Sequence, residues 1–374
     1  METLLSTSSN PEYISFALGL PALECFPITN FQQCVNDVLQ HDALAMQYAP
    51  PLEKLKEHII QIMKKRGVEC TREQILLTSG AQQGINLLVK LLLENRGKVM
   101  LEELAYPGIM QAIASYRPQV ITIPTHLESG IDIDQILHYL KAGNRPSFLY
   151  IVTDGSNPLG LSQTNEARCQ LAELAEKYNM PIIEDDPYGF LNYDKNIKPI
   201  SAYNKNHVFY VGSFSKIFAP SLRCGWIIGP SSLICRLASI KESSDINMAT
   251  FAQRIILSYL SKFNIHEHIA KVRDACLEKR NHLIGHVLKH FPDTIQYKLP
   301  QSGIFLWVEL ENHNTTQLLE MALKEIKVAF VPSEAFASSH AMKKINGMRL
   351  NFSRPSIKEI DVGIEKLGRL IKQL

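Results

Sequence analysis

The chain has 374 residues, of which 45% are hydrophobic and 20% charged, so its composition is that of a globular protein and excludes disordered or collagen-like chains. Basic residues number 39 and acidic residues 37, and no run of like charges indicates a nucleic-acid or membrane partner. The length exceeds the size at which a single core usually stops growing, so we expect more than one packed unit.

The seven cysteines are scattered, with neither a Cys-x-x-Cys pair nor a spacing typical of metal ligands. The histidines, among them His41, His126 and His207, show no metal-ligand spacing either, so we expect no metal site. The first residues lack a basic segment followed by an apolar one, and no stretch approaches eighteen apolar residues. These features predict a cytoplasmic protein with reduced cysteines.

From residue 75 onward, short apolar segments alternate with segments of helical periodicity. Helices are predicted at 82–94 and 165–179, and strands at 75–79, 98–103, 120–124, 147–153, 181–186, 207–213 and 224–230. Apolar strands that alternate with helices indicate a largely parallel sheet covered on both faces. In such a sheet we expect the chemistry at the carboxyl ends of the strands.

The pattern changes after about residue 231. Long helices are predicted around 233–260 and 264–290, followed by strands at 303–310 and 348–353 and a final helix at 356–374. This change predicts a second, smaller α+β domain. We expect an N-terminal arm (1–40) that packs with the small domain, a large domain (41–274) and a small C-terminal domain (275–374).

The segment VGSFSKIFAPSLRCGWIIGP, at 211–230, places Lys216 in apolar surroundings. A surface lysine beside a turn would look similar, but desolvation can also hold a lysine neutral and make it an amine nucleophile toward a carbonyl carbon. Ser213, Ser215 and Arg223 add hydroxyl donors and a planar cation, which suit a phosphate group. A lysine nucleophile beside a phosphate cradle points to pyridoxal phosphate.

Three other segments fit this hypothesis. In TSGAQQGINLL (78–88), the amides of Ala81 and Gln82 are expected at a helix N-terminus, where phosphate binds. In IIEDDPYGF (182–190), Asp185 could keep a pyridine nitrogen protonated, with Tyr188 nearby. In SNPLG (156–160), Asn157 could donate to the cofactor's phenolate oxygen. Taken singly, each segment is also typical of an ordinary turn.

Together, these motifs resemble the fold-type I pyridoxal-phosphate enzymes. The resemblance is strongest to class I/II aminotransferases of the kynurenine/2-aminoadipate type and to the aminotransferase-like domains of certain bacterial regulators. It runs from FALGLP (16–21) to MRLNFS (348–353). It implies a mostly parallel seven-stranded sheet flanked by helices, a smaller α+β C-terminal domain, and a homodimer with shared active sites.

The resemblance also implies roles for individual residues. Lys216 would form the Schiff base with the cofactor and then move protons at the substrate's α-carbon. Asp185 would pair with the pyridine nitrogen, and Asn157 and Tyr188 would hydrogen-bond the phenolate oxygen. Tyr106, in the segment LAYPG, would stack on the cofactor ring.

Further residues would hold the phosphate and the substrate. Arg349 would bind the substrate's α-carboxylate as a bidentate pair, helped by the backbone near Gly19 and by Asn157. The phosphate would be held by Ala81, Gln82, Ser213, Ser215, Arg223 and, from the partner subunit, Tyr48.

The chain departs from the family pattern at three places. Leu18 stands where the family usually has a glycine, beside the expected carboxylate site. The Gly-rich loop that commonly follows Tyr48 is shortened. The turn at 153–160 reads TDGSNPLG, in which Asp154 is expected either as a turn residue or as a partner for a cationic substrate side chain.

The motifs predict loss of the substrate's α-proton, after which several reactions are open. We expect transamination of an L-amino acid against a 2-oxo acid. The alternative is an elimination or cyclisation in specialised metabolism, resembling capreomycidine synthase, in which a hydroxylated arginine loses water and closes a ring. A ligand-sensing regulator is less expected, since the residues before FALGLP leave no room for a winged helix-turn-helix. An inactive homologue is disfavoured because the key residues are present.

Overall fold

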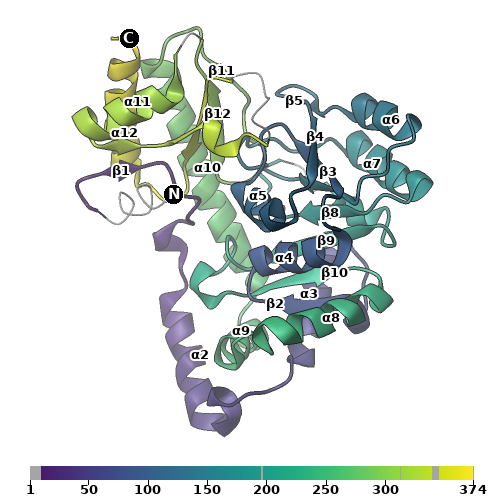
Figure 1. Ribbon diagram of the computed structural model, residues 1–374. Coiled ribbons are helices and arrows are strands. Elements are labelled where there is room, and N and C mark those ends of the chain that lie inside the picture. The colour runs from purple at the N-terminus through teal and green to yellow at the C-terminus, as the bar shows by residue number, and fades with distance from the viewer. Residues whose placement is uncertain (1–9, 195–196, 312, 339–344, 374) are drawn as a thin grey trace.

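A seven-stranded sheet forms the centre of the larger body (Figure 1). The computed structural model describes residues 10–194, 197–311, 313–338 and 345–373. The strand order is β2-β10-β9-β8-β7-β3-β4, and β10 alone runs antiparallel to its neighbours. The predicted mostly parallel sheet is therefore confirmed, with strands β2 (Ile75–Thr78), β3 (Lys98–Glu102), β4 (Gln119–Ile123), β7 (Phe148–Val152), β8 (Ile182–Asp185), β9 (Val208–Ser213) and β10 (Gly225–Ile228).

Both faces of this sheet are buried, which explains why its strands are apolar throughout. Along β7, Phe148 and Tyr150 belong to the large core on one face, whereas Leu149 and Ile151 belong to a second core on the other. Helices α4 (Ala81–Leu92) and α5 (Pro107–Ile113) contribute to the first core, and α6 (Ile133–Lys141) and α7 (Asn165–Tyr178) to the second.

The predicted helix at 233–260 is wrong, because two helices occupy this stretch: α8 (Ser231–Asp245) and α9 (Thr250–Lys262). The chain leaves the helical conformation at Ile246, which has a φ of 59°. The side chain of Asn247 then donates to the carbonyl of Ala49 at 2.5 Å. Helix α9 packs against α2 (Ile28–His41) and α3 (Glu53–Lys65).

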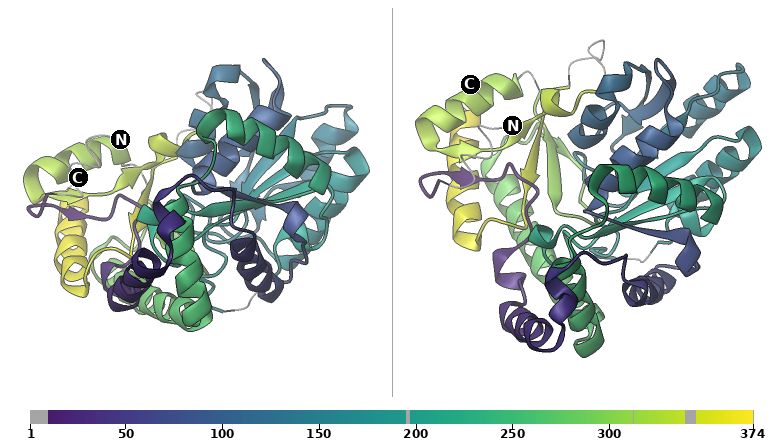
Figure 2. Two further views of the ribbon diagram at one scale, coloured as in Figure 1. Left: turned by 90° about the horizontal axis from the view of Figure 1, so that it is seen from below. Right: turned by 60° about the horizontal axis from the view of Figure 1, so that its bottom comes forward.

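The smaller body contains a four-stranded antiparallel sheet in the order β11-β12-β15-β14 (Figure 2). Its strands are β11 (Gln296–Tyr297), β12 (Phe305–Glu309), β14 (Val331–Pro332) and β15 (Gly347–Asn351). Its helices are α10 (Ile265–His290), α11 (Thr315–Met321) and α12 (Ile357–Ile371).

The N-terminal segment contacts both bodies. Strand β1 (Ile14–Ser15) pairs in parallel with β13 (Val328–Ala329) beside the small sheet, while α2 packs on α9. The domain division that the sequence predicts, between residues 274 and 275, falls inside the continuous helix α10. Because this helix runs across the proposed division, the domain boundaries stay a prediction.

The remaining elements are short. A two-stranded pair, β5 (Thr125–His126) with β6 (Gly130–Ile131), follows β4. Single helical turns lie at Leu23–Cys25, Ala43–Met46, Arg72–Gln74, Ala114–Tyr116, Ile200–Ala202, Pro220–Leu222, Ala322–Ile326 and Ser333–Phe336. None of the described helices combines the length and the apolar character that a bilayer crossing requires.

Strand register determines which side chains meet at the edge of the large sheet. Val152 on β7 is opposite Asp185 on β8, which in turn is opposite Val211 on β9. Because these parallel strands end at nearly the same level, the turns that follow them converge there. Those turns carry the candidate residues Asn157, Tyr188 and Lys216.

Candidate active site

A cavity of about 390 Å³ lies at the carboxyl ends of the large sheet and extends to β15 of the small sheet. Its volume is in the range of small-molecule sites in proteins. Every site residue that the sequence predicts lines it, except Tyr48 and Asp154. The predicted residues that line it are Gly19, Ala81, Gln82, Tyr106, Asn157, Asp185, Tyr188, Ser213, Ser215, Lys216, Arg223 and Arg349.

Lys216 follows β9 and points into this cavity, where its Nζ donates to the carbonyl oxygen of Gly19 at 2.5 Å. Burial, together with the nearby cations Arg349 and Arg223, lowers the pKa of the ammonium to about 8, while Asp185 opposes the shift. A substantial fraction of the amine is therefore neutral near physiological pH, the form required for attack on a carbonyl.

Asp185 ends β8 with a buried carboxyl group. Its Oδ2 accepts from the hydroxyl of Tyr150 at 2.7 Å, whereas its Oδ1 is buried and has no hydrogen-bond partner among the residues that the structure describes. Burial raises the pKa of this carboxyl to about 7. An unsatisfied buried oxygen is costly, and a protonated ring nitrogen of a cofactor would satisfy it.

The N-terminus of α4 forms an anion-binding corner. Gly80 precedes the helix with a φ of 86°, and a Cβ there would lie 2.4 Å from Nη2 of Arg223. That guanidinium donates from Nη2 to the carbonyl of Ser79 at 3.1 Å. Glycine thus allows Arg223 to lie against the amides of Ala81 and Gln82, where a phosphate would meet donors from both.

Two hydroxyl groups complete this corner. The single O–H of Ser213 can donate either to the Oγ of Ser215, at 2.9 Å, or to the carbonyl of Cys224, at 3.3 Å. Both hydroxyl groups line the cavity beside Lys216. The arrangement presents donors to an anion, so the residues present fit the phosphate of pyridoxal phosphate.

Tyr106 lines the cavity directly before α5. Helix α5 is tied to α4 by Gln82, whose Nε2 donates to the carbonyl of Gly108 at 2.9 Å. A Cβ at Gly108 would lie 2.2 Å from the ring of Tyr106, so only glycine lets this ring occupy its position. The ring therefore has a defined place from which it can stack on a planar ligand.

Arg349 on β15 provides the cation on the small-domain side of the cavity. Its Nη1 donates to Oδ1 of Asn157 at 2.6 Å, and its Nη2 donates to the carbonyl of Ala17. The guanidinium carbon lies 4.1 Å from the ring centroid of Phe305 and 5.0 Å from that of Phe336. Burial lowers the pKa of Arg349 to about 10, which still leaves it charged at neutral pH.

Tyr188 is buried at the cavity wall with its ring edge-on to Phe305, at 5.7 Å between centroids. Burial raises the pKa of its phenol, so it remains a hydrogen-bond donor at physiological pH. The side chain of Asn157 uses only its oxygen in the described hydrogen bonds, which leaves its amide nitrogen as a donor. Both side chains thus suit an anionic oxygen.

The suggestion that Asp154 meets a cationic substrate side chain is wrong. This carboxylate is fully buried outside the cavity and is already engaged by two arginines. Arg66 contacts its Oδ2 at 2.8 Å, and Arg168 contacts its Oδ1 at 2.7 Å. Arg66 also pairs with Asp186 at 2.9 Å. The aspartate in the unusual turn at 153–160 is therefore explained by an internal ionic network.

Tyr48 lies outside the cavity of its own chain, and its side chain is 83% exposed. Leu18 lines the cavity next to Gly19, as expected from its position in the sequence. Sequence reasoning missed Tyr150, Phe305 and Phe336, which support Asp185 and Arg349. They lie within strands or turns whose apolar pattern gives no sign of a site.

Comparisons with known proteins identify the family. The family model described as aminotransferase class I and II matches residues 27–367. An aromatic-amino-acid aminotransferase 1 from Thermococcus litoralis is 32% identical over 99% of this chain and 90% of its own length. A kynurenine aminotransferase structure from Pyrococcus horikoshii, in complex with PMP, has a TM-score of 0.93 at 31% identity and covers 100% of this chain and 94% of its own.

A third relative has a cofactor-derived group bound. The α-aminoadipate aminotransferase LysN of Thermus thermophilus, complexed with N-(5'-phosphopyridoxyl)-L-leucine, has a TM-score of 0.91 at 28% identity and covers 100% of this chain and 94% of its own. The chain therefore belongs to the aminotransferase class I and II family, with the fold-type I architecture. Its activity is that of a pyridoxal-phosphate-dependent aminotransferase.

Proposed function

We propose that the cavity around Lys216 holds pyridoxal phosphate and transfers the amino group of an L-amino acid to a 2-oxo acid. The observation that carries this proposal is that one cavity contains both a lysine whose pKa is lowered to about 8 and a buried aspartate, Asp185, whose Oδ1 has no partner in the described part of the chain. A nucleophilic amine and an acceptor for a ring N–H are what this cofactor requires.

Each part of the cofactor has residues suited to it. The phosphate would lie at the N-terminus of α4 against Arg223, with Ser213 and Ser215 as hydroxyl donors. Asp185 would accept from the ring nitrogen, and Tyr106 would cover the ring. Asn157 and Tyr188 would donate to the phenolate oxygen, with Lys216 at the aldehyde.

Bound there, pyridoxal phosphate supplies an aldehyde to the amine and a ring that takes up the electron pair released at the substrate's α-carbon. Asp185 keeps the ring nitrogen protonated, which strengthens this uptake. Once substrate has displaced it, Lys216 would act as the base that removes the α-proton and as the acid that delivers a proton to the carbon that was the cofactor's aldehyde. Its lowered pKa suits both steps near neutral pH.

The substrate's α-carboxylate would bind Arg349 as a bidentate pair. Phe305 and Phe336 hold this guanidinium by stacking, and Leu18 and Val331 add apolar surface to the cavity. Such a wall favours amino acids with large, weakly polar side chains. The aromatic-amino-acid and kynurenine aminotransferases among the relatives agree with this range.

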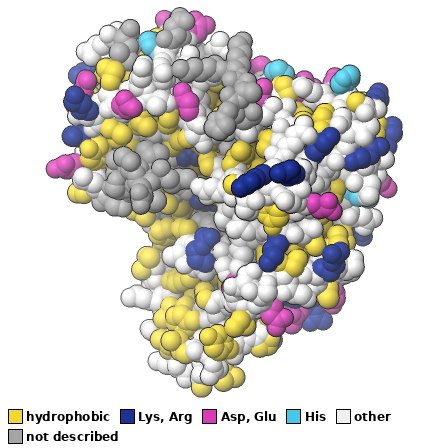
Figure 3. Space-filling model, viewed as in Figure 1, with side chains coloured by type: hydrophobic (Ala, Val, Ile, Leu, Met, Phe, Trp, Pro, Cys, Tyr) yellow, Lys and Arg dark blue, Asp and Glu magenta, His cyan; other side chains and the backbone are white. Residues whose placement is uncertain are grey.

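We further propose a homodimer in which Tyr48 reaches the phosphate of the partner's site. Large apolar side chains gather on the face around α2 and the turn after it (Figure 3). They include Leu39, Leu44, Met46 and Tyr48, which are 55%, 61%, 78% and 83% exposed. A cluster of this kind is typical of a protein interface.

A steady-state assay tests the proposed function. Purified protein with pyridoxal phosphate is given phenylalanine, kynurenine or 2-aminoadipate as donor and 2-oxoglutarate as acceptor, and glutamate formation is measured. We expect transfer from at least one donor and none with Lys216→Ala. The absence of glutamate with every donor, or equal activity in the variant, would contradict the proposal. Light scattering tests the dimer separately.

A further inference from the structure

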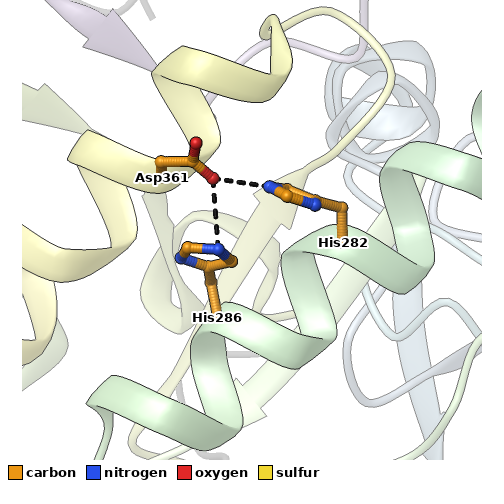
Figure 4. Close-up of side chains that lie close together, drawn as sticks. All are labelled: His282, His286 and Asp361. Carbon is orange, nitrogen blue, oxygen red and sulfur yellow. Dashed lines mark hydrogen bonds and ion pairs between the residues drawn. The ribbon is translucent and has the colours of Figure 1, made fainter.

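Three potential metal ligands meet between α10 and α12, outside the active-site cavity (Figure 4). His282 and His286 stand one helical turn apart on α10, so their rings lie on the same face of that helix. Asp361 projects from α12 toward both rings. The three ligand atoms lie within 4.8 Å of one another.

The two imidazoles converge on a single carboxylate oxygen. Nε2 of His282 lies 2.5 Å from Oδ1 of Asp361, and Nε2 of His286 lies 3.1 Å from the same atom. In a tetrahedral site with metal–ligand bonds of about 2.1 Å, neighbouring ligand atoms are about 3.4 Å apart. Small rotations of these side chains would therefore place all three donors around one ion.

The backbone holds the two helices close enough for this arrangement. A Cβ at Gly368 of α12 would lie 2.6 Å from the carbonyl oxygen of His290 on α10, so glycine allows the two helices to touch. The side chains of His282, His286 and Asp361 are 32%, 24% and 42% exposed. An ion can reach them from solvent, and water can fill a fourth coordination position.

His282 and His286 are four residues apart in the sequence, which is a metal-ligand spacing on a helix, so the expectation that the histidines show no such spacing is wrong. Asp361 is 79 residues from His282, so only the fold completes the set.

We propose that His282, His286 and Asp361 form a binding site for a divalent transition-metal ion, with zinc as the expected occupant. Two imidazoles and one carboxylate are donors that zinc accepts, whereas calcium and magnesium prefer oxygen donors. The ion links α10 to α12 within the smaller body. Because none of the three residues lines the active-site cavity, we expect the ion to have a structural role, in which it stabilises the packing of these two helices.

The test uses metal-stripped holoenzyme without an affinity tag, in a Cys235→Ser background because the Cys235 thiol is exposed and would bind zinc on its own. Zinc is titrated by calorimetry, and cobalt is added separately as a spectroscopic probe. The variants are His286→Gln and Asp361→Asn. The matched control is His290→Gln, since this ring stacks on His286 at 5.7 Å but lies outside the ligand set.

We expect one zinc ion per chain, intense visible absorption from four-coordinate cobalt, and a thermal midpoint that rises with zinc. Each ligand variant should weaken zinc binding at least tenfold, lose the cobalt spectrum and lose the rise in midpoint. The control should keep all three. Far-UV circular dichroism of the metal-free variants checks that they are folded.

Two results would overturn the proposal. One is the absence of stoichiometric zinc binding to the parent protein. The other is weak binding that the ligand variants and the control change equally, which would indicate adventitious surface association. Since none of these residues lines the active-site cavity, transaminase activity does not enter the readout.

Discussion

The ionic network behind the 153–160 turn makes a strong prediction about stability. Asp154 is fully buried and is shared by Arg66 and Arg168. The change Asp154→Asn keeps the shape of the side chain but removes its charge. Arg66 keeps Asp186 as a charged partner. Within the part of the chain that the structure describes, Arg168 would keep only uncharged hydrogen-bond acceptors, which include the carbonyls of Thr153, Gln163 and Lys198.

The expected cost follows from leaving a buried guanidinium without its carboxylate. Removing one partner of a buried ion pair destabilises a protein by about 3–5 kcal/mol. That is a large part of a typical folding free energy of about 5–15 kcal/mol. We therefore expect Asp154→Asn to lower the urea midpoint clearly and, because Asn157 lies in the same turn, to weaken cofactor binding.

The assay is urea unfolding followed by circular dichroism, with Asp274→Asn as the control. Asp274 also pairs with an arginine, Arg273, but their side chains are 64% and 41% exposed. A surface pair of this kind contributes little, so the control midpoint should barely move. If Asp154→Asn shifted the midpoint no more than the control, the network would add no net stability and the reasoning would be refuted.

The same network has a defined pH dependence. Burial by itself would raise the pKa of Asp154, but Arg168 and Arg66 outweigh it and hold the pKa below its ordinary value. A carboxyl with a lowered folded-state pKa contributes stability above its unfolded pKa of about 3.9, and this contribution is lost as the pH falls further. The stability difference between wild type and Asp154→Asn should therefore shrink in acid and persist at pH 7.

Further predictions concern four single residues. Cofactor-free protein should take up pyridoxal phosphate faster as the pH rises through about 8, where Lys216 loses its proton, and Lys216→Ala should abolish amino transfer in the glutamate assay. Arg349→Lys should raise the KM for amino acids by about tenfold to a hundredfold, because a bidentate charged pair contributes roughly 1.5–3 kcal/mol. An unchanged KM would contradict the assignment of Arg349 to the substrate's α-carboxylate. Gly80→Ala should weaken cofactor binding in a fluorescence titration, since its Cβ would lie 2.4 Å from Arg223. Gly285 lies in the middle of α10, and a Cβ there would meet nothing within 4 Å, so Gly285→Ala should raise the free energy of unfolding by about 1 kcal/mol.

The sheet and most of the cavity could be predicted because local signals mark them. Apolar strands ending in polar turns place Asp185, Asn157 and Lys216 at one edge, and strand register then brings them together. The glycine at 80 and the helix that follows it are likewise visible in the sequence. These features depend on residues near one another in the chain.

The remainder depends on contacts between distant segments. Asp154 looks like a turn residue until Arg66, 88 positions earlier, is placed against it. The hydroxyl of Tyr150 reaches Asp185 only because β7 and β8 are neighbours. The helix break at Ile246 comes from the backbone conformation of that residue and from the hydrogen bond that the Asn247 side chain donates to the Ala49 carbonyl. Neither feature leaves a sign in the helical periodicity of the sequence.

The central claim is that Lys216 serves an aminotransferase and not an elimination or cyclisation enzyme. The most direct measurement mixes cofactor-loaded protein with single amino acids, including kynurenine, 2-aminoadipate, arginine and hydroxyarginines, without any 2-oxo acid. Mass spectrometry then identifies the cofactor and the product. We predict stoichiometric conversion of the cofactor to pyridoxamine phosphate with one matching 2-oxo acid. Catalytic turnover to a dehydrated or cyclised amino acid, with the cofactor still an aldehyde, would contradict the account.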